Sequence, residues 1–366
     1  MGIMPWHDRA ASLRQPSSPP SSSAARLPPP SFAHLRRLTD GIGVWEHARG
    51  STPRREHGFC TDDNARALMV VSRQESSSGG LVDLAATYLE FVVAARTADG
   101  RFHNRRRADG AWADTVGSDD SQGRAWWALG TVARQGPTTA MRRTGVDAFT
   151  ASSAFASTHL RSNAYAALGA AEMIAAHPGH AAATALLEQT AGVIADAAAN
   201  TIPWPETRLT YDNARMPEAL LAAGAALGDR RLVSIGLRLL EWLVAVESNG
   251  NHFSFTPDGG WAPGELRPGF DQQPIEAASM AEACFRAWGI TGDPAWRTSA
   301  IDAAQWLLGH NDTGMALYDP ATGSTGDGLM ENSVNENRGA ESTIAGIAAL
   351  QIAALCAQEG HRFSAR

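Results

Sequence analysis

The sequence contains little that would support a disulfide, a metal or a nucleotide. Its three cysteines are widely spaced, so they form neither a disulfide framework nor a CxxC metal site, and reduced cytoplasmic thiols are expected. GxGxxG and Walker loops are absent, which excludes the common nucleotide sites. His47, His57, Cys60 and Asp62 are neighbours in the chain but match no ligand spacing. We therefore expect no metal and no cofactor.

A strong excess of one charge and a long apolar run are lacking as well. The formal net charge is −7 and the pI is near 5.9, which gives no electrostatic reason to expect a nucleic-acid partner. No apolar run of signal-peptide length opens the chain, and no later segment is predicted to be long and apolar enough to cross a bilayer. These features predict a cytoplasmic protein without a membrane partner.

The first part of the chain differs in composition from the rest. Residues 1–30 are rich in Ser and Pro, as in SSPPSSSAARLPPP, which predicts a disordered N-terminal segment. The chain as a whole is 44% hydrophobic and can bury a large core. Helical stretches are spread evenly over residues 31–366, so we predict that this part forms one domain rather than two or three.

A polar cluster returns six times, each time where a helical apolar stretch begins. The occurrences are TDDNARALMV from Thr61, SDDSQGRAWWALG from Ser118, RSNAYAALGAAEMI from Arg161, YDNARMPEALLAAG from Tyr211, FDQQPIEAASMAEA from Phe270 and NENRGAESTIAGIAAL from Asn335. Helical periodicity predicts inner helices at 62–74, 119–134, 162–176, 213–227, 273–290 and 336–356. It predicts outer helices at 31–39, 81–97, 139–160, 180–200, 229–248 and 293–309. A repeated unit of this kind predicts an all-α fold of six helix pairs in a closed ring.

The connections between these helices are asymmetric. Links from an inner to an outer helix are short, as at 177–180 and 228–229, whereas most return links are long and contain Asp-Gly turn signals. Long loops in compact domains are usually functional. They lie at the same end as the polar helix starts, so we expect the pocket there. The inner helices are rich in Ala and Gly, which permits close approach of neighbours.

Two Asp-Asp pairs are the leading catalytic candidates. The pairs at 62–63 and 119–120 each follow a good N-cap residue, so they could simply complement the helix dipole. Their repetition at equivalent places favours function. A general acid needs a raised pKa, which burial or a second carboxylate would provide, so the working pair is expected to be split between helices. The predicted catalytic residues are Asp62, Asp63, Asp120 and Asp271, with Asp63 working alongside Asp120 or Asp271.

Four arginines and four loop tryptophans extend this set. Arg66, Arg124, Arg215 and Arg338 are expected to pair with carboxylates, and two left unpaired at the mouth would indicate an anionic substrate such as a uronic acid or a phosphorylated sugar. The loop tryptophans either stack on sugar rings or pin the loops, and they are Trp45, Trp112, Trp204 and Trp261.

A wider polar set is predicted to bind the substrate. Gln272 and Gln273 flank Asp271 with donors and acceptors that suit sugar hydroxyls, whereas Glu218 and Glu276 could equally complement the starts of their helices. The predicted binding residues are His57, Asn64, Arg66, Trp112, Asp119, Arg124, Asp212, Asn213, Arg215, Gln272, Glu276, Asn337 and Glu341.

The segment LTDGIGVWEHARGSTPRREHGFCTDDNARAL resembles a known family. It is similar to the opening of a glycoside-hydrolase-like helical domain found alone or appended to bacterial glycosyltransferases, in which His-Gly-Tyr-Cys-x-Asp-Asp-Asn-Ala-Arg-Ala recurs. Residues 57–67 keep this pattern, with Phe59 in place of the tyrosine. The resemblance implies an (α/α)6 toroid that acts on saccharides, with long hairpin-bearing loops at the pocket end and a functional association with a glycosyltransferase.

The predicted activity is that of a glycoside hydrolase acting on an oligosaccharide or polysaccharide. One carboxyl would protonate the leaving oxygen while the other activates water. A sugar epimerase or isomerase on the same toroid is an alternative, and it would need histidines in the pocket, where only His57 and His103 are candidates. A non-catalytic saccharide-binding module associated with glycosyltransferases is a further alternative. Sugar identity, linkage and oligomeric state are left open by the sequence.

Overall fold

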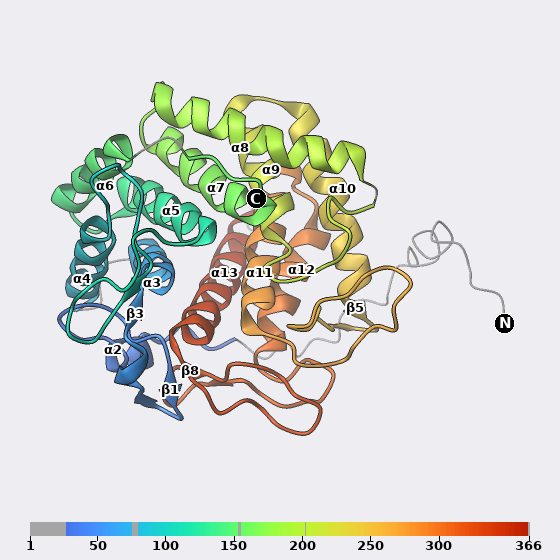
Figure 1. The fold of residues 1–366 in the computed structure, drawn as a ribbon. Helices are drawn as coiled ribbons and strands as arrows, with labels where there is room; N and C mark the ends of the chain where they lie inside the picture. The colour runs from blue at the N-terminus through green and yellow to red at the C-terminus, as the bar shows by residue number, and fades with distance from the viewer. Residues whose placement is uncertain (1–26, 75–79, 153–154, 202, 365–366) are drawn as a thin grey trace.

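The computed structural model describes residues 27–364 with the exception of 75–79, 153–154 and 202. The predicted disordered segment, 1–30, lies almost entirely outside the described residues, and its last residues, 27–30, form irregular chain. Most of the described chain is helical, and the helices surround a common centre (Figure 1).

The inner ring is a closed circle of six helices. Each inner helix packs against the next along the chain, and the last packs against the first, which closes the ring. The inner helices are α3 (Thr61–Arg73), α5 (Asp119–Gln135), α7 (Leu160–Ala176), α9 (Arg215–Leu227), α11 (Pro274–Thr291) and α13 (Ala340–Ser364).

The outer helices alternate with the inner ones along the chain. Each of them packs on an inner partner, so that α4 covers α3, α6 covers α5, and the first outer helix, α2, covers α13. The outer helices are α2 (Ala33–Arg37), α4 (Leu81–Ala94), α6 (Thr139–Ala151), α8 (Ala181–Asn200), α10 (Arg230–Glu247) and α12 (Pro294–Trp306). The predicted all-α (α/α)6 toroid is therefore confirmed.

Small residues let the inner helices approach one another, as expected from their composition. A Cβ atom added at Gly130 of α5 would collide with the backbone carbonyl of Gly169 on α7, and one added at Gly123 would collide with the carbonyl of Ser162. Helices α5 and α7 thus pack backbone to backbone along this line. A larger side chain at either glycine would push the two inner helices apart.

Local signals explain where most helices begin, but three boundaries differ clearly from the expected ones, since α13 also continues to Ser364 rather than ending near residue 356. Helix α6 ends at Ala151 rather than near residue 160, because the backbone turns to an extended conformation at Ser152. Helix α13 begins at Ala340 rather than at residue 336. Asn335 and Asn337 use their side chains to bond loop backbone groups, and such bonds compete with helix formation.

The start of α3 also differs from expectation in its cap. Thr61 is the first residue of the helix, and the side chain of Cys60 takes the N-cap position by accepting a hydrogen bond from the backbone N–H of Asp63 at 3.4 Å. The Thr61 hydroxyl instead donates to the backbone carbonyl of His103 at 2.6 Å. In α5 the predicted cap is present, since Ser118 accepts from the N–H of Ser121 at 3.3 Å.

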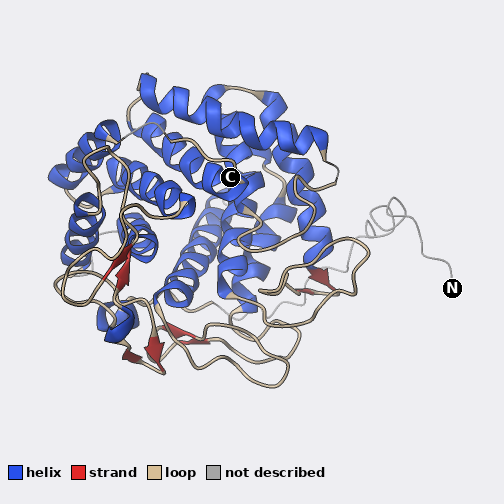
Figure 2. Ribbon diagram, in the orientation of Figure 1, coloured by secondary structure: helices blue, strands red, loops and turns tan. Residues whose placement is uncertain are grey.

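The long loops carry short antiparallel strand pairs, three of them hairpins, at one end of the toroid (Figure 2). The pairs are β1 (Ala48–Arg49) with β2 (Thr52–Pro53), β3 (Phe59–Cys60) with β4 (Arg105–Arg106), β5 (Ser248–Asn249) with β6 (His252–Phe253), and β7 (Tyr318–Asp319) with β8 (Ser324–Thr325). The β3–β4 pair joins two different loops, which brings the segment before α3 next to the segment before α5.

One helix contradicts the expectation that no segment could cross a bilayer. By length and composition alone, Ala340–Gln358 of α13 passes as a membrane span. In the fold, 78% of that stretch is buried, because α13 belongs to the inner ring and contacts helices on both sides. Its apolar side chains are therefore part of the protein core.

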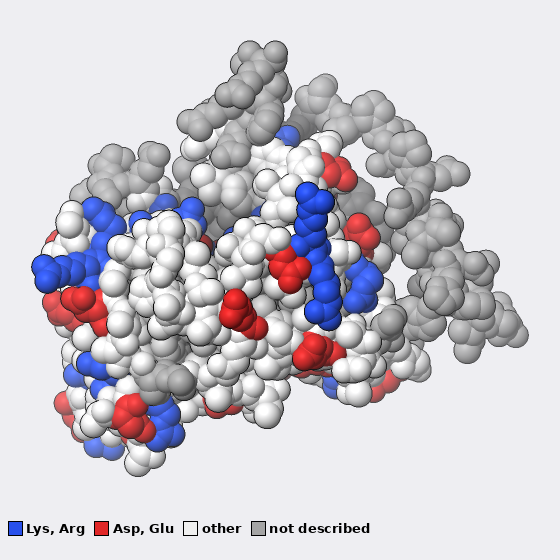
Figure 3. Space-filling model, turned by 90° about the horizontal axis from the view of Figure 1, so that it is seen from above, with Lys and Arg blue, Asp and Glu red and all other residues white. Residues whose placement is uncertain are grey.

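The face opposite the hairpins has few charged side chains. Figure 3 views the toroid from above the orientation of Figure 1, in which β1 and β8 lie toward the bottom. Most described side chains on this face are uncharged, and basic and acidic groups lie intermixed rather than gathered by sign. The face offers no broad basic surface among the described residues of the kind that nucleic acids require.

Candidate active site

Residues from three inner helices converge in one ion-pair network at the hairpin end. Arg66 lies 2.9 Å from Asp62, 3.3 Å from Asp63 and 2.8 Å from Glu341 of α13. Arg124 of α5 also pairs with Asp62. The structure therefore brings together five of the predicted site residues, which come from three distant segments of the chain, at the starts of α3, α5 and α13.

The network continues to α7 and α9 through Asp212. This buried carboxylate lies 3.3 Å from Arg124 and 3.1 Å from Arg215, and it accepts a hydrogen bond from the Tyr165 hydroxyl at 2.8 Å. Asp212 has a positive φ of 48°, the only such non-glycine residue in the described chain. The strained turn is held by Glu276, whose carboxylate accepts the backbone N–H groups of Asp212 and Asn213.

Below this network the axis of the toroid is filled. Arg215 pairs with Glu218 at 2.7 Å and with Glu282, which also pairs with Arg73. The cavity that remains among these side chains has a volume of about 30 Å³. This space is too small for a sugar ring, so we expect a saccharide to approach the network from the hairpin end.

The adjacent carboxyls of Asp62 and Asp63 have opposite pKa shifts. Burial acts to raise the pKa of Asp62, but the guanidiniums of Arg124 and Arg66 together outweigh it and lower that pKa to about 2. Burial raises the pKa of Asp63 to about 7, and the carboxylate of Asp62 adds to the effect while Arg66 opposes it. At neutral pH one carboxyl of the pair is ionised and the other is close to half-protonated.

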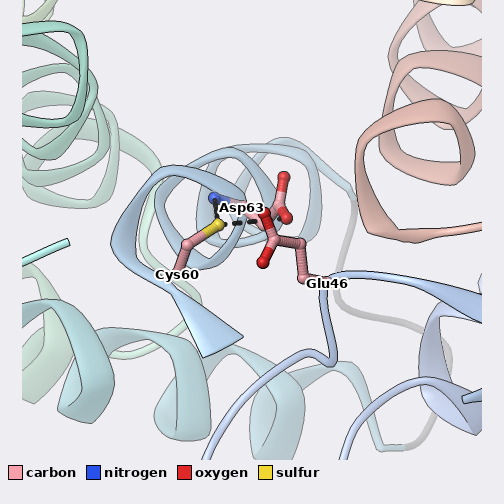
Figure 4. Close-up of side chains that lie close together, drawn as sticks. All are labelled: Glu46, Cys60 and Asp63. Atoms are coloured by element: carbon pink, nitrogen blue, oxygen red, sulfur yellow. Dashed lines mark hydrogen bonds between the residues drawn. The ribbon is translucent and has the colours of Figure 1, made fainter. Parts of the chain in front are cut away.

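Asp63 lies in a small cluster with Cys60 and Glu46 (Figure 4). The Cys60 thiol donates to Oδ2 of Asp63 at 3.1 Å, and burial raises the pKa of this thiol well above its usual value. Glu46 comes from the loop before α3, and it pairs with Arg105 of β4. The three side chains offer carboxylate and sulfur atoms within 4.8 Å of one another. In this arrangement the protonated thiol donates to Asp63, so Cys60 and Asp63 share a buried hydrogen bond at the start of α3.

Asp120 is oriented by two hydroxyl groups. Ser162 of α7 donates to its Oδ1, and Tyr211 donates to its Oδ2. Tyr211 is 39% exposed, and its ring lies over the guanidinium of Arg161 at 4.8 Å. The neighbouring Asp119 accepts a hydrogen bond from Ser157 at 2.6 Å. Asp120 therefore has a fixed carboxylate beside an exposed aromatic ring.

Asp271 lies in a second acidic group on the loop before α11. Burial raises its pKa, and the carboxylates of Asp327 and Asp258 add to the shift. Its Oδ1 is buried without a hydrogen-bond partner among the described residues. Two predicted binding residues nearby form hydrogen bonds to the protein's own backbone. Gln272 is fully buried and bonds the N–H of Phe255, and Asn337 accepts the N–H of Ala48.

Asn64 is also buried, and its side chain bonds the backbone of Val44 and Cys60. It therefore holds the loop before α3 rather than facing the mouth. His57 is exposed, and its ring meets that of His47 edge to face at 4.8 Å.

The loop tryptophans divide into two groups. Trp45, Trp204 and Trp261 are at most 8% exposed, so they pin the loops and offer no stacking surface. Trp112 is half-buried and stacks on His103 with 5.0 Å between ring centroids.

Three of the four arginines expected to be paired have carboxylate partners. Arg66, Arg124 and Arg215 all pair in the network, whereas Arg338 donates to the hydroxyl of Ser324 at 2.6 Å. These arginines therefore do not supply the two unpaired cations at the mouth that would have indicated an anionic substrate.

Several residues of the site were not identified from the sequence. They are Glu46, Ser162, Tyr165, Tyr211 and Glu282, and each reaches the site through a contact with a residue distant in the chain. The two tyrosines had the clearest signal, because the chain has four tyrosines and these two lie inside polar clusters at helix starts.

Comparisons with known proteins connect the fold, but not the sequence, to carbohydrate enzymes. No protein-family model and no curated protein matches the chain. Among solved structures, a sugar epimerase from a ruminal bacterium is 12% identical, with a TM-score of 0.68 over 88% of this chain and 95% of its own. Cellobiose 2-epimerase from Spirochaeta thermophila is 11% identical, with a TM-score of 0.65 over 90% and 93% of the two chains.

A GH76 α-mannanase from Bacteroides thetaiotaomicron is also similar. It is 12% identical, with a TM-score of 0.62 over 90% of this chain and 95% of its own. At such identities the likeness concerns the fold. The chain has the (α/α)6-toroid, glycoside-hydrolase-like fold on which both sugar epimerases and glycoside hydrolases are built.

Proposed function

We propose that the protein is a carbohydrate-active enzyme that cleaves a glycosidic bond with Asp63 as its general acid. One observation carries this proposal: the environment separates the pKa values of two adjacent carboxyls, to about 2 for Asp62 and about 7 for Asp63. Such a separation is typical of acid and base assignments in active sites. A carboxyl that retains its proton near neutral pH can protonate a leaving oxygen.

Asp120 is the first candidate for the partner carboxylate that activates water. It lies at the start of α5, which packs against α3, and two hydroxyl groups fix its orientation. Asp271 is the second candidate, since it has a buried oxygen without a partner. The anomeric form of the product, followed by NMR, would distinguish an inverting from a retaining reaction.

The neighbouring residues have supporting roles in this scheme. Arg66 and Arg124 keep Asp62 ionised, and that negative charge helps to keep the proton on Asp63. Asp212 and Glu276 hold the turn that carries Tyr211. The exposed Tyr211 ring is the surface suited to stacking on a sugar, because the Trp112 ring already stacks on His103 and has the guanidinium of Arg106 over it.

Sugar epimerisation or isomerisation is the second candidate function. His47 and His57 meet edge to face at the mouth, and Asn337 donates to His47 at 3.4 Å. Two neighbouring imidazoles are groups of the kind that can remove a proton from a sugar carbon and return it. The solved epimerases with this fold add support. A cytoplasmic location and an association with a glycosyltransferase remain proposals that rest on the sequence alone.

The test is a glycan panel incubated with the purified chain and with Asp63→Asn. Reducing-end release and product mass are both recorded. Asp99→Asn is the matched control, because Asp99 is half-exposed in a loop where it pairs with Arg101. The proposal expects cleavage that is lost in Asp63→Asn and kept in the control. A product of unchanged mass would favour the epimerase, and binding without turnover by the unmodified chain would contradict both enzyme functions.

A further inference from the structure

Two cavities adjoin each other at the rim of the mouth, between the loop of β1–β2 and the loop of β4. One has a volume of about 500 Å³ and the other about 390 Å³, and both are lined by Glu56. Together they form a groove, called the rim groove below. His57 and Asn337, both predicted to bind substrate, line its two parts.

The rim groove is positive although the protein is negative overall. Its lining contains six arginines against three carboxylates, which leaves three positive charges on a chain whose net charge is −7. The arginines are Arg49, Arg54, Arg55, Arg105, Arg106 and Arg107. Local positive charge in a concave surface concentrates anions despite an opposite net charge. Guanidinium groups match the planar forks of carboxylates and phosphates.

Much of this charge is available to a ligand. Arg54 pairs with Glu56 and Arg107 pairs with Asp109, but these pairs are largely exposed and exchange readily. Arg49 and Arg55 have no carboxylate within ion-pair distance among the described residues, and Arg55 lies over the ring of Trp45. These groups can turn toward an incoming anion without leaving a buried charge behind.

Arg106 is the residue that makes the groove a preformed site. Its guanidinium lies 5.2 Å from the ring centroid of Trp112 and 5.6 Å from that of Phe91, and Nε donates to the carbonyl of Gly110 at 2.9 Å. Within the described residues it has no carboxylate partner. A cation that is held in place by aromatic rings and a carbonyl, with its charge uncompensated, is prepared to bind an anion.

The rim groove is connected to the candidate general acid. Arg105 lines the groove and pairs with Glu46, and Glu46 lies in the cluster of Asp63 and Cys60 (Figure 4). Through Arg105 and Glu46, the arginines of the groove are therefore next to the cluster that contains Asp63. Nucleic acid is the less favoured occupant, because the positive charge is confined to this groove and the face in Figure 3 has no broad basic surface among the described residues.

We propose that the rim groove binds the anionic group, carboxylate or phosphate, of an acidic saccharide substrate. This inference rests on the proposed function for the claim that the ligand is a saccharide. Arg106, supported by Arg55, would then supply the free positive charge for an anionic substrate that Arg66, Arg124, Arg215 and Arg338 do not supply.

Calorimetry with defined probes tests the proposal, using the full chain that carries Asp63→Asn so that no probe is consumed. The probes are trigalacturonate, its methyl ester as the neutral match, mannose 6-phosphate and a uridine hexanucleotide. Tighter binding of trigalacturonate than of its ester, or binding of the phosphate sugar, is expected. Arg106→Gln should weaken that binding by about tenfold, the usual effect of one charge-assisted hydrogen bond. Arg143→Gln on outer helix α6 is the matched control and should leave it unchanged.

The outcomes separate this proposal from the proposed function. Equal binding of the acid and its ester, or no dependence on Arg106 for either the carboxylate or the phosphate probe, would overturn the rim-groove assignment. Tighter, Arg106-dependent binding of the hexanucleotide would overturn its saccharide part. Cleavage of neutral glycans alone would leave the hydrolase standing without an anionic subsite. Arg106-dependent binding of an acidic saccharide without turnover in the unmodified chain would support the anionic subsite and contradict the hydrolase.

Discussion

Replacing Asp63 by asparagine should change the pH dependence of stability in a direction that the structure specifies. The pKa of this carboxyl is raised from its usual value of 3.8 to about 7 in the folded protein, with burial as the largest cause. Between these two pH values the folded state holds a proton that the unfolded state has released. The unfolded state therefore binds fewer protons, and the free energy of unfolding falls as pH rises through this window.

The magnitude follows from the width of the window. Each unit of pKa difference corresponds to about 1.4 kcal/mol, so Asp63 lowers stability by up to about 4 kcal/mol between pH 4 and pH 7. Asparagine cannot ionise and removes this contribution. The stability of Asp63→Asn relative to the unmodified protein should therefore increase with pH across the window and level off above it. If losing the contacts to Cys60 costs a constant free energy, it shifts the stability difference by the same amount at every pH and leaves its slope unchanged.

The assay is urea unfolding followed by tryptophan fluorescence at several pH values from 4 to 8. Ser72→Ala is the control, because Ser72 is also buried on α3 and does not titrate. The difference between this control and the unmodified protein should be independent of pH. A pH-independent difference for Asp63→Asn as well would refute the raised pKa, and with it the reason for choosing Asp63 as the general acid. If the stability of Asp63→Asn relative to the unmodified protein fell as pH rose, the pKa of Asp63 would be lowered rather than raised by folding.

Three further predictions concern packing, charge and the candidate base. Gly130→Ala places a Cβ against the backbone of Gly169 and should destabilise the fold by about 1–3 kcal/mol, measured by the same unfolding assay. Arg124→Ala removes the cation shared by Asp62 and Asp212, each of which keeps a second arginine, and should cost about 1.5–3 kcal/mol, so a near-neutral result would contradict the network. Tyr211→Phe keeps the exposed ring but loses the hydroxyl bond to Asp120, so kcat should fall by about tenfold with KM unchanged in steady-state kinetics on a cleaved glycan. A change confined to KM would instead make Tyr211 a binding residue only.

Local patterns in the sequence were sufficient to predict the elements of the fold. Helical periodicity placed most inner and outer helices within a few residues of their observed bounds, the ends of α6 and α13 excepted, because an amphipathic helix carries its burial pattern in its own residues. The polar starts of the inner helices were visible for the same reason, and so were the carboxylates of Asp62 and Asp63. The starts of α3 and α13 were less predictable, since the cap of Cys60 and the loop bonds of Asn337 depend on geometry that no local pattern encodes.

The division of labour within the site was decided by tertiary contacts. Adjacent aspartates on one helix are equivalent in sequence, yet Arg124 from α5 lowers the pKa of Asp62 while burial raises the pKa of Asp63. Tyr211 reaches Asp120 across 91 residues, and Arg105 reaches Glu46 across 59. The sequence by itself therefore determined the helices, their order and the polar residues at their starts. Only the closed ring decided which charges meet, because electrostatic and hydrogen-bond energies depend on distances in space and on exclusion of water.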